Sequence, residues 1–224
     1  MAISDIIRDS ICQTYGLSPQ SVPRINNGVD TRRFAGAPIP HEGVLFICVA
    51  RFTMQKNHKL LLEAFSQAKK QVENIRLCLV GDGELRPQIE AQIHTLGLAE
   101  DVVLAGVSGD VERFLHESDA FVMSSDYEGL PLSVMEAMAA GLPIVSTRAG
   151  GVPNILEEGA NAFMVEPGDA GALADRMCRI ARSPEIRQAF GARSLALSAA
   201  FDIREMVRQY ETLYQGGKLP GSGR

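Results

Sequence analysis

Tryptophan is absent from this 224-residue sequence, and aromatic residues make up only 6% of it. Small aliphatic side chains must therefore fill most of any core, as they do in α/β proteins. No apolar run approaches the roughly 18 residues that a membrane-spanning helix needs. The first ten residues contain acids and no long apolar stretch, so neither a membrane span nor a signal peptide is expected. The length suits one sizeable domain.

Cysteine and histidine are too scattered to predict a metal site or a disulfide framework. Cys12, Cys48, Cys78 and Cys178 show no CxxC spacing. Cys48 and Cys78 lie within apolar runs, which predicts buried free thiols in a reducing compartment. The four histidines form neither an HExxH motif nor a Cys/His cluster, so no metal is expected. These features favour a cytoplasmic protein.

Excess positive charge is also lacking, since the net charge is −5, and this argues against a nucleic-acid binder. The charge is uneven along the chain. Residues 1–70 carry nine Lys/Arg and five Asp/Glu, whereas the remaining residues carry 13 and 22. The basic N-terminal part is suited to hold a small anion, and a solvated surface of mixed charge is the alternative interpretation.

Short apolar runs alternate with amphipathic stretches through the middle of the chain. Residues 44–50 (VLFICVA) are continuously apolar, as expected of a strand buried on both faces, whereas residues 57–72 repeat apolar side chains along one helical face. This β-α-β-α order predicts an α/β fold with a Rossmann-like, doubly wound parallel sheet that binds ligands beyond the carboxyl ends of its strands. Further strands are expected at residues 75–80, 102–105, 120–123, 144–146 and 162–165, and further helices at 85–96, 111–116 and 133–140.

Both ends of the chain depart from this alternation. A helix is expected at residues 3–15 without a preceding strand, and three consecutive helices are expected at 169–181, 184–199 and 203–214. We therefore divide the chain into residues 1–30, the remnant of an N-terminal domain with its linker; 31–200, the Rossmann-like domain; 201–215, a helix suited to dock on a missing domain; and 216–224, a disordered tail.

The segment 124–147 (SSDYEGLPLSVMEAMAAGLPIVST) carries the most informative pattern. Glu128 lies where a strand should end, and Glu136 follows one or two turns into the next helix. Gly129 permits close approach of the backbone to a ligand, and a helix start in the crevice favours an anion. The alternative is that Glu136 forms a capping box with Ser133 and only caps the helix, and the spacing alone leaves both open.

The motifs of several other enzyme classes are absent from this sequence. The segment 81–86 (GDGELR) breaks the dinucleotide pattern GxGxxG, because Arg86 replaces the third glycine. GxxxxGK[ST] and GxSxG are absent, so a P-loop is excluded and Ser124 and Ser125 are expected to be buried or turn hydroxyls. A DxD pair of the kind that metal-dependent glycosyltransferases use is also missing.

The segment 128–147 resembles the Glu-x7-Glu signature of family 4 retaining glycosyltransferases, which have two Rossmann-like domains around a cleft. The resemblance covers about residues 20–180 and implies the C-terminal half of a GT-B fold, with extra C-terminal helices. Asn57 replaces a family glycine and Asn154 replaces a family glutamate. The other matching motifs are residues 27–30 with Phe34 (NGVDxxxF), 50–52 with Lys56 (GRLxxxKG), 81–86 (GDGPLR), 104–107 (FLGxV) and 150–153 (GGxxE).

The resemblance implies a role for each matching residue. Arg51 and Lys56 would clamp the donor diphosphate, where fixed cations stabilise the growing charge of the leaving group. For Arg51, a surface charge at a strand end is the alternative. Glu128 would face the donor sugar, and Glu136 would hold the nucleotide ribose hydroxyls. Gly106 and Val107 would meet the base through backbone groups, and Gly129, Leu130 and Leu132 would line the phosphate end.

The resemblance also implies an activity, the transfer of a sugar from a nucleoside-diphosphate sugar with retention of configuration. A UDP-sugar is the preferred donor and a GDP-sugar the second choice, with no metal. A sugar or lipid-linked acceptor would be bound by a missing N-terminal domain or partner chain, in polysaccharide synthesis in the cytoplasm or at the inner face of the membrane. The fragment alone would be inactive. The alternatives are a non-catalytic nucleotide-sugar-binding module and a GT-B-type epimerase or phosphorylase relative.

Overall fold

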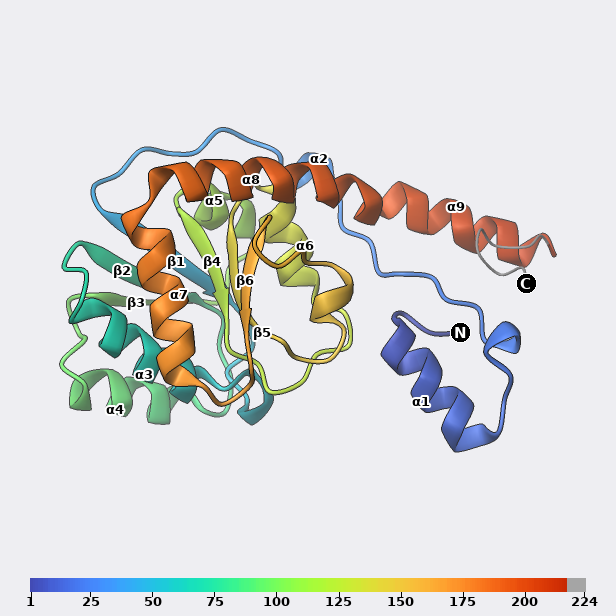
Figure 1. Cartoon of the computed structure of the whole chain (residues 1–224), viewed down its shortest axis with the longest axis horizontal. Helices are drawn as coiled ribbons and strands as arrows, with labels where there is room; N and C mark the ends of the chain where they lie inside the picture. Colours follow the sequence, from blue (N-terminus) through green and yellow to red (C-terminus); the bar gives the residue numbers. More distant parts are fainter. Residues whose placement is uncertain (217–224) are drawn as a thin grey trace.

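A six-stranded parallel sheet forms the centre of the computed structural model, which describes residues 1–216. Its strand order is β3-β2-β1-β4-β5-β6, so the direction of winding reverses between β1 and β4 (Figure 1). This reversal is the topological switch point of a doubly wound fold, and it confirms the predicted Rossmann-like class. The strands are β1 (Val44–Val49), β2 (Ile75–Val80), β3 (Val102–Gly106), β4 (Ala120–Met123), β5 (Ile144–Thr147) and β6 (Ala162–Val165).

The central strand β1 is buried on both faces, as its continuous apolar sequence predicts. Phe46 belongs to the core cluster on one side of the sheet and Ile47 to the cluster on the other, and both are fully buried. All four cysteines are buried and free, which confirms the expectation for Cys48 and Cys78. Burial raises the pKa of Cys48 to about 12, so this thiol is inert.

Helices cover both faces of the sheet (Figure 1), and all of them except the unpredicted short helix at residues 31–34 lie within a few residues of the predicted positions. One layer consists of α3 (His58–Lys69), α4 (Arg86–Thr95) and α7 (Ala170–Arg182), and the other of α2 (Thr31–Phe34), α5 (Val111–His116) and α6 (Leu132–Ala139). Helix α8 (Pro184–Ser198) packs against both α6 and α7. Four 3-10 turns join these elements: η1 (Pro19–Ser21), η2 (Met54–Lys56), η3 (Val152–Asn154) and η4 (Ala199–Phe201).

A helix at each end lies outside these layers. Helix α1 (Asp5–Tyr15) begins after the cap residue Ser4 and forms a small cluster of its own, in which Ala2, Cys12 and Val22 are buried. Helix α9 (Ile203–Tyr214) has no buried residue and extends away from the sheet (Figure 1). No helix within residues 1–216 is long and apolar enough to cross a membrane. The tail predicted at 216–224 lies outside the described residues, apart from Gly216.

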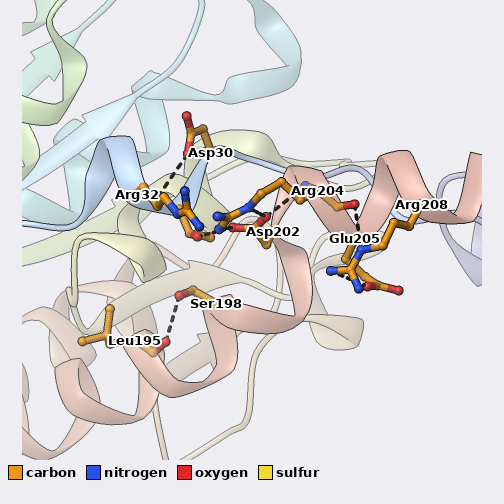
Figure 2. Close-up of polar contacts among 9 residues, drawn as sticks. Asp30, Arg32, Leu195, Ser198, Asp202, Arg204, Glu205 and Arg208 are labelled. Atoms are coloured by element: carbon orange, nitrogen blue, oxygen red, sulfur yellow. Dashed lines mark hydrogen bonds and ion pairs between the residues drawn. The ribbon is translucent and has the colours of Figure 1, made fainter.

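The chain leading into the sheet pairs with the chain leading into α9. The amide of Val29 donates to the carbonyl of Phe201, and the amide of Ile203 donates to the carbonyl of Val29, both at 2.9 Å. Asp202 accepts hydrogen bonds from Arg204 (Figure 2) and from Thr31, and these bonds hold its pKa well below the usual range. We call this pairing of residues 28–31 with 201–204 the clasp.

A surface cavity of about 490 Å³ lies beside the clasp. None of the residues to which the sequence assigns a site lines it. Its lining consists of Thr31, Arg32, Ala199, Asp202, Arg204, Glu205 and Arg208.

Candidate active site

The loops that follow β1 and β4 meet at the topological switch point. There the Lys56 ammonium lies 2.6 Å from the Oε1 atom of Glu128. The exposed fractions of the two side chains are only 21% and 6%, so this ion pair is largely shielded from water. The fold therefore joins two residues that the sequence separates by 72 positions and that belong to two different family motifs.

The backbone at Lys56 is fixed by groups that the motif alone does not reveal. The buried Ser124 hydroxyl lies 3.0 Å from the carbonyl oxygens of both Lys56 and Asn57. Asn57 has φ +47°, a left-handed conformation that glycine favours and asparagine tolerates. Its side chain also accepts a hydrogen bond from the amide of Leu60, capping α3, and donates to Asp126 at 2.8 Å. Asparagine therefore meets the conformational requirement of the family glycine here.

The loop that carries Glu128 lies against the glycine pair 150–151. The amide of Gly151 donates to the carbonyl of Glu128 at 3.0 Å. A Cβ atom at Gly150 would overlap that carbonyl, and one at Gly151 would overlap the carbonyl of Gly129. The double glycine is therefore required for close backbone packing beside Glu128. On the other side, the Asn27 amide donates to the carbonyl of Leu130 at 3.4 Å.

Arg51 follows β1 and is exposed. Its guanidinium makes no hydrogen bond or ion pair with any residue in the range 1–216 and is therefore available to an anion. The next residue, Phe52, is fully buried, and its carbonyl accepts the amide of Leu85. Gly81 and Gly83 lie where a Cβ atom would overlap the backbone of the Arg51 loop. Residues 81–83 (GDG) thus pack against this loop, which explains why glycine is required at positions 81 and 83.

Glu136 does not cap its helix. Helix α6 has Pro131 as its N-cap residue, with no side-chain cap, and Ser133 already lies within the helix. The capping-box alternative is therefore wrong. Burial raises the pKa of Glu136, while Arg33 opposes the shift and Glu112 adds to it. No group within residues 1–216 hydrogen-bonds this carboxylate, which leaves its oxygens available to accept hydrogen bonds.

The remaining predicted residues differ in their accessibility. Gly106 ends β3 with φ +72°, and its carbonyl accepts the amide of Gly81 at 2.8 Å. Val107 is 81% exposed and Leu132 45% exposed, which is unusual for apolar side chains. The side chain of Leu130 is buried in the core, so this residue can offer a ligand only backbone groups.

His58 is a buried titratable group that sequence reasoning did not assign. Its ring packs edge-on against Phe52, with 4.7 Å between the ring centroids, and neither ring nitrogen has a hydrogen-bond partner within residues 1–216. Burial, with a smaller effect of Lys56, lowers its pKa to about 4. His58 is therefore neutral at physiological pH.

Other groups near the site gave weak signals or none in the sequence. Ser124 and Ser125 were expected to be buried or turn hydroxyls, and both are fully buried. No feature of the sequence indicated that Arg33 or Glu112 lies near the site. Within residues 1–216, no three His, Cys, Asp or Glu side chains gather as they would around a metal ion.

The family model for glycosyl transferases group 1 matches residues 30–195, about three quarters of the chain. The chain belongs to this family. The group 1 glycosyltransferase motifs that meet at the switch point are thus part of a matched domain.

Curated relatives of this group 1 domain include a lipopolysaccharide core biosynthesis glycosyltransferase, LpsD, of Rhizobium meliloti. It is 32% identical over 179 residues, which are 80% of this chain and 51% of the relative. The N-acetyl-alpha-D-glucosaminyl L-malate synthase of Bacillus anthracis is 29% identical over 171 residues, 76% of this chain and 45% of the relative. The chain spans about half the length of the curated relatives it matches.

Solved structures of glycosyltransferases share the fold of this group 1 domain. HepE from Anabaena in complex with UDP and glucose superimposes with a TM-score of 0.87 at 22% identity, over 95% of this chain and 62% of that protein. These neighbours confirm the expected GT-B-type fold.

Proposed function

We propose that the chain is the donor-binding domain of a retaining glycosyltransferase of family 4, and that it takes a nucleoside-diphosphate sugar at the switch-point crevice. The observation that carries the proposal is the shielded Lys56–Glu128 pair, where the loops after β1 and β4 meet. Ligands of doubly wound sheets bind at this point of the fold. The carboxylate holds the ammonium in place until an anion arrives.

In this proposal each charged group has one task. Lys56 and the exposed Arg51 hold the diphosphate and stabilise the charge that develops on it. Glu128 faces the donor sugar. Glu136, buried and without an internal hydrogen-bond partner, accepts the hydroxyls of the ribose. Gly106 and Val107 meet the base, and the backbone of residues 129–132 lines the phosphate end.

The proposed reaction replaces one bond at the anomeric carbon with another. The bond from this carbon to the diphosphate oxygen breaks, and a bond from it to the acceptor oxygen forms on the same face. The acceptor proton passes to the leaving phosphate. The chain contributes cations that stabilise the departing diphosphate, and closure of the cleft excludes water.

The proposed donor is a UDP-sugar, with a GDP-sugar second, and the proposal involves no metal. The complex of HepE with UDP and glucose supports UDP. The acceptor would be a sugar or a lipid-linked sugar bound by a further domain or a partner chain, on which α9 would dock. Relatives named for lipopolysaccharide synthesis support a role in surface polysaccharides. Four free thiols support a cytoplasmic location, at the inner membrane face if the further domain binds there.

Calorimetric titration of the full chain with UDP, GDP and ADP tests the proposal. We expect saturable binding of one nucleotide, weakened in the Glu136→Ala variant and unchanged in a control variant at the exposed Glu73. Absence of binding by all three nucleotides would overturn the proposed function.

A second experiment separates an enzyme from a binding module. An acceptor-binding domain supplied as a second chain should enable sugar transfer, and Lys56→Ala should then reduce turnover strongly. Binding of the nucleotide without transfer under any complementation would identify a non-catalytic module. Undiminished turnover in the Lys56 variant would remove this residue from the mechanism.

A further inference from the structure

Arg33 connects the two places to which the proposed function assigns the nucleoside. It lies on the short helix α2, which packs against both α5 and α6. Helix α5 follows the loop that begins with Val107, and α6 carries Glu136. Helix α2 therefore lies beside both the helix that follows the loop at Val107 and the helix that carries Glu136.

The contacts of Arg33 to the loop after β3 are direct. Its Nη2 atom donates to the carbonyl of Gly109 at 2.8 Å and to the Oε2 atom of Glu112 at 2.7 Å. Gly109 lies two residues beyond Val107 and has no side chain that could anchor it. Arg33 thus anchors the loop 107–110 to helix α2 through a charge-assisted hydrogen bond, which is stronger than one between neutral groups.

The backbone at Arg33 is held in a fixed position. Phe34 is buried in the core, and its carbonyl pairs with the Nε2 atom of His116 at 2.8 Å. The ring of His116 also fills the space beside Gly36. The guanidinium therefore projects from a rigid base, although 47% of its side chain is exposed.

The charged groups that act on Glu136 are Arg33 from α2 and Glu112 from α5. Burial disfavours the carboxylate form of Glu136 and Glu112 repels it, while Arg33 is the cation that stabilises it. The ionised carboxylate can accept one ribose hydroxyl on each of its oxygens, whereas protonation turns one of these oxygens into a donor and removes the negative charge that strengthens both bonds. An exposed ion pair adds little to stability, so variants that break the Arg33–Glu112 pair should still fold.

We propose that Arg33 positions the nucleoside end of the donor site, by anchoring the loop 107–110 through the Gly109 carbonyl and by placing positive charge on α2, which packs against the helix that carries Glu136. The inference rests on the proposed function, in which this end binds base and ribose. Arg33 is a positioning residue, because it acts through the loop and through Glu136.

Two variants that break the Arg33–Glu112 ion pair should differ in their effect on nucleotide affinity. Arg33→Ala removes the loop anchor and the positive charge on α2, and we expect about tenfold weaker binding of the nucleotide that the parent chain prefers, equivalent to about 1.4 kcal/mol. The loss should grow as the pH falls from 7 to 5.5, because Glu136 then takes up a proton more readily. Glu112→Gln removes a negative neighbour of Glu136 and leaves the Gly109 contact, so affinity should hold or rise.

Arg33→Lys should restore part of the affinity, since it keeps the charge. Arg113→Ala, which breaks the exposed Arg113–Glu117 pair on the same helix α5, should bind like the parent. The dissociation constant of inorganic diphosphate, obtained from its competition with nucleotide, should be the same in the parent and in Arg33→Ala. The reason is that the proposed diphosphate site lies at Lys56 and Arg51.

The outcomes separate this inference from the function beneath it. If the parent binds none of UDP, GDP and ADP, the proposed function fails and the inference with it. If the parent binds a nucleotide and Arg33→Ala stays within twofold of it, the inference alone is overturned. The inference would also be overturned if Arg33→Ala and Glu112→Gln weakened nucleotide binding equally and left its pH dependence unchanged. The ion pair would then have a structural role only.

Discussion

Gly150 lies so close to Glu128 that any side chain at position 150 would overlap the carbonyl oxygen of Glu128. The loop between β5 and β6 therefore supports, through its backbone, the acidic residue that pairs with Lys56. A side chain added at Gly150 or Gly151 should therefore also displace the Lys56–Glu128 ion pair.

Gly150→Ala should displace the Glu128 loop and destabilise the domain. Gly150 has φ +52°, so a Cβ atom adds backbone strain to the overlap, and a loss of about 2 kcal/mol is expected. Urea unfolding measures this loss. Gly171→Ala on α7 is the matched control, because its Cβ atom would meet no atom closer than 3.6 Å. Equal stability of the two variants would contradict the close packing at 150.

The Lys56–Glu128 pair should show strong thermodynamic coupling. Lys56→Met leaves a buried carboxylate without its partner, at a cost of up to about 3 kcal/mol. The double variant Lys56→Met/Glu128→Gln should be more stable than the two single losses predict, because it removes both charges. A double-mutant cycle from urea unfolding measures the coupling. Simple additivity within about 0.5 kcal/mol would show that the two residues do not interact.

Asn57 should be replaceable by glycine and not by alanine. Asn57→Gly loses the cap of α3 but relieves the left-handed conformation, so only a small change in stability is expected. Asn57→Ala loses the cap and keeps the strain, at about 2 kcal/mol. Asp169→Ala, which removes the cap of α7 at φ −91°, isolates the cost of a cap alone. Thermal unfolding compares the three, and an alanine variant as stable as the glycine variant would sink the argument.

His58 should make stability depend on pH. Its folded pKa of about 4 lies below the ordinary value of 6.5, so the unfolded chain takes up the proton first as the pH falls. The free energy of unfolding is therefore highest above pH 6.5 and falls as the pH drops toward 4. Between pH 7.5 and pH 5 the loss should be about 2 kcal/mol. Urea unfolding at several pH values should show this loss in the parent and not in His58→Leu. The exposed His94, replaced by Gln, serves as the control.

The sequence predicts the sheet and its helices well because their signals are local. The apolar run at residues 44–50 and the alternating pattern that follows it identify β1 and α3 to within a few residues. The same pattern predicted a parallel sheet with helices on both faces, whereas the strand order was not predicted and comes from the structure.

The contacts around the candidate site were less predictable because they join distant positions. Nothing in the sequence indicated that Arg33 lies against Gly109, or that the backbone at Lys56 is held by Ser124. The spacing Ser133-x-x-Glu136 even suggested a cap that the helix start at Leu132 does not form. Such contacts depend on three-dimensional packing, which a pattern of residue types does not encode locally.

The clasp between residues 28–31 and 201–204 joins segments that are far apart in the chain by two backbone hydrogen bonds. The strands and helices between Val29 and Ile203 pack into the two core clusters on the faces of the sheet, whereas α9 beyond them buries no residue. Local opening of α9 should therefore be possible without loss of the sheet, and the clasp marks where one cooperative folding unit ends. Amide protons of α9 should exchange with solvent through fraying, and those of β1 only through global unfolding.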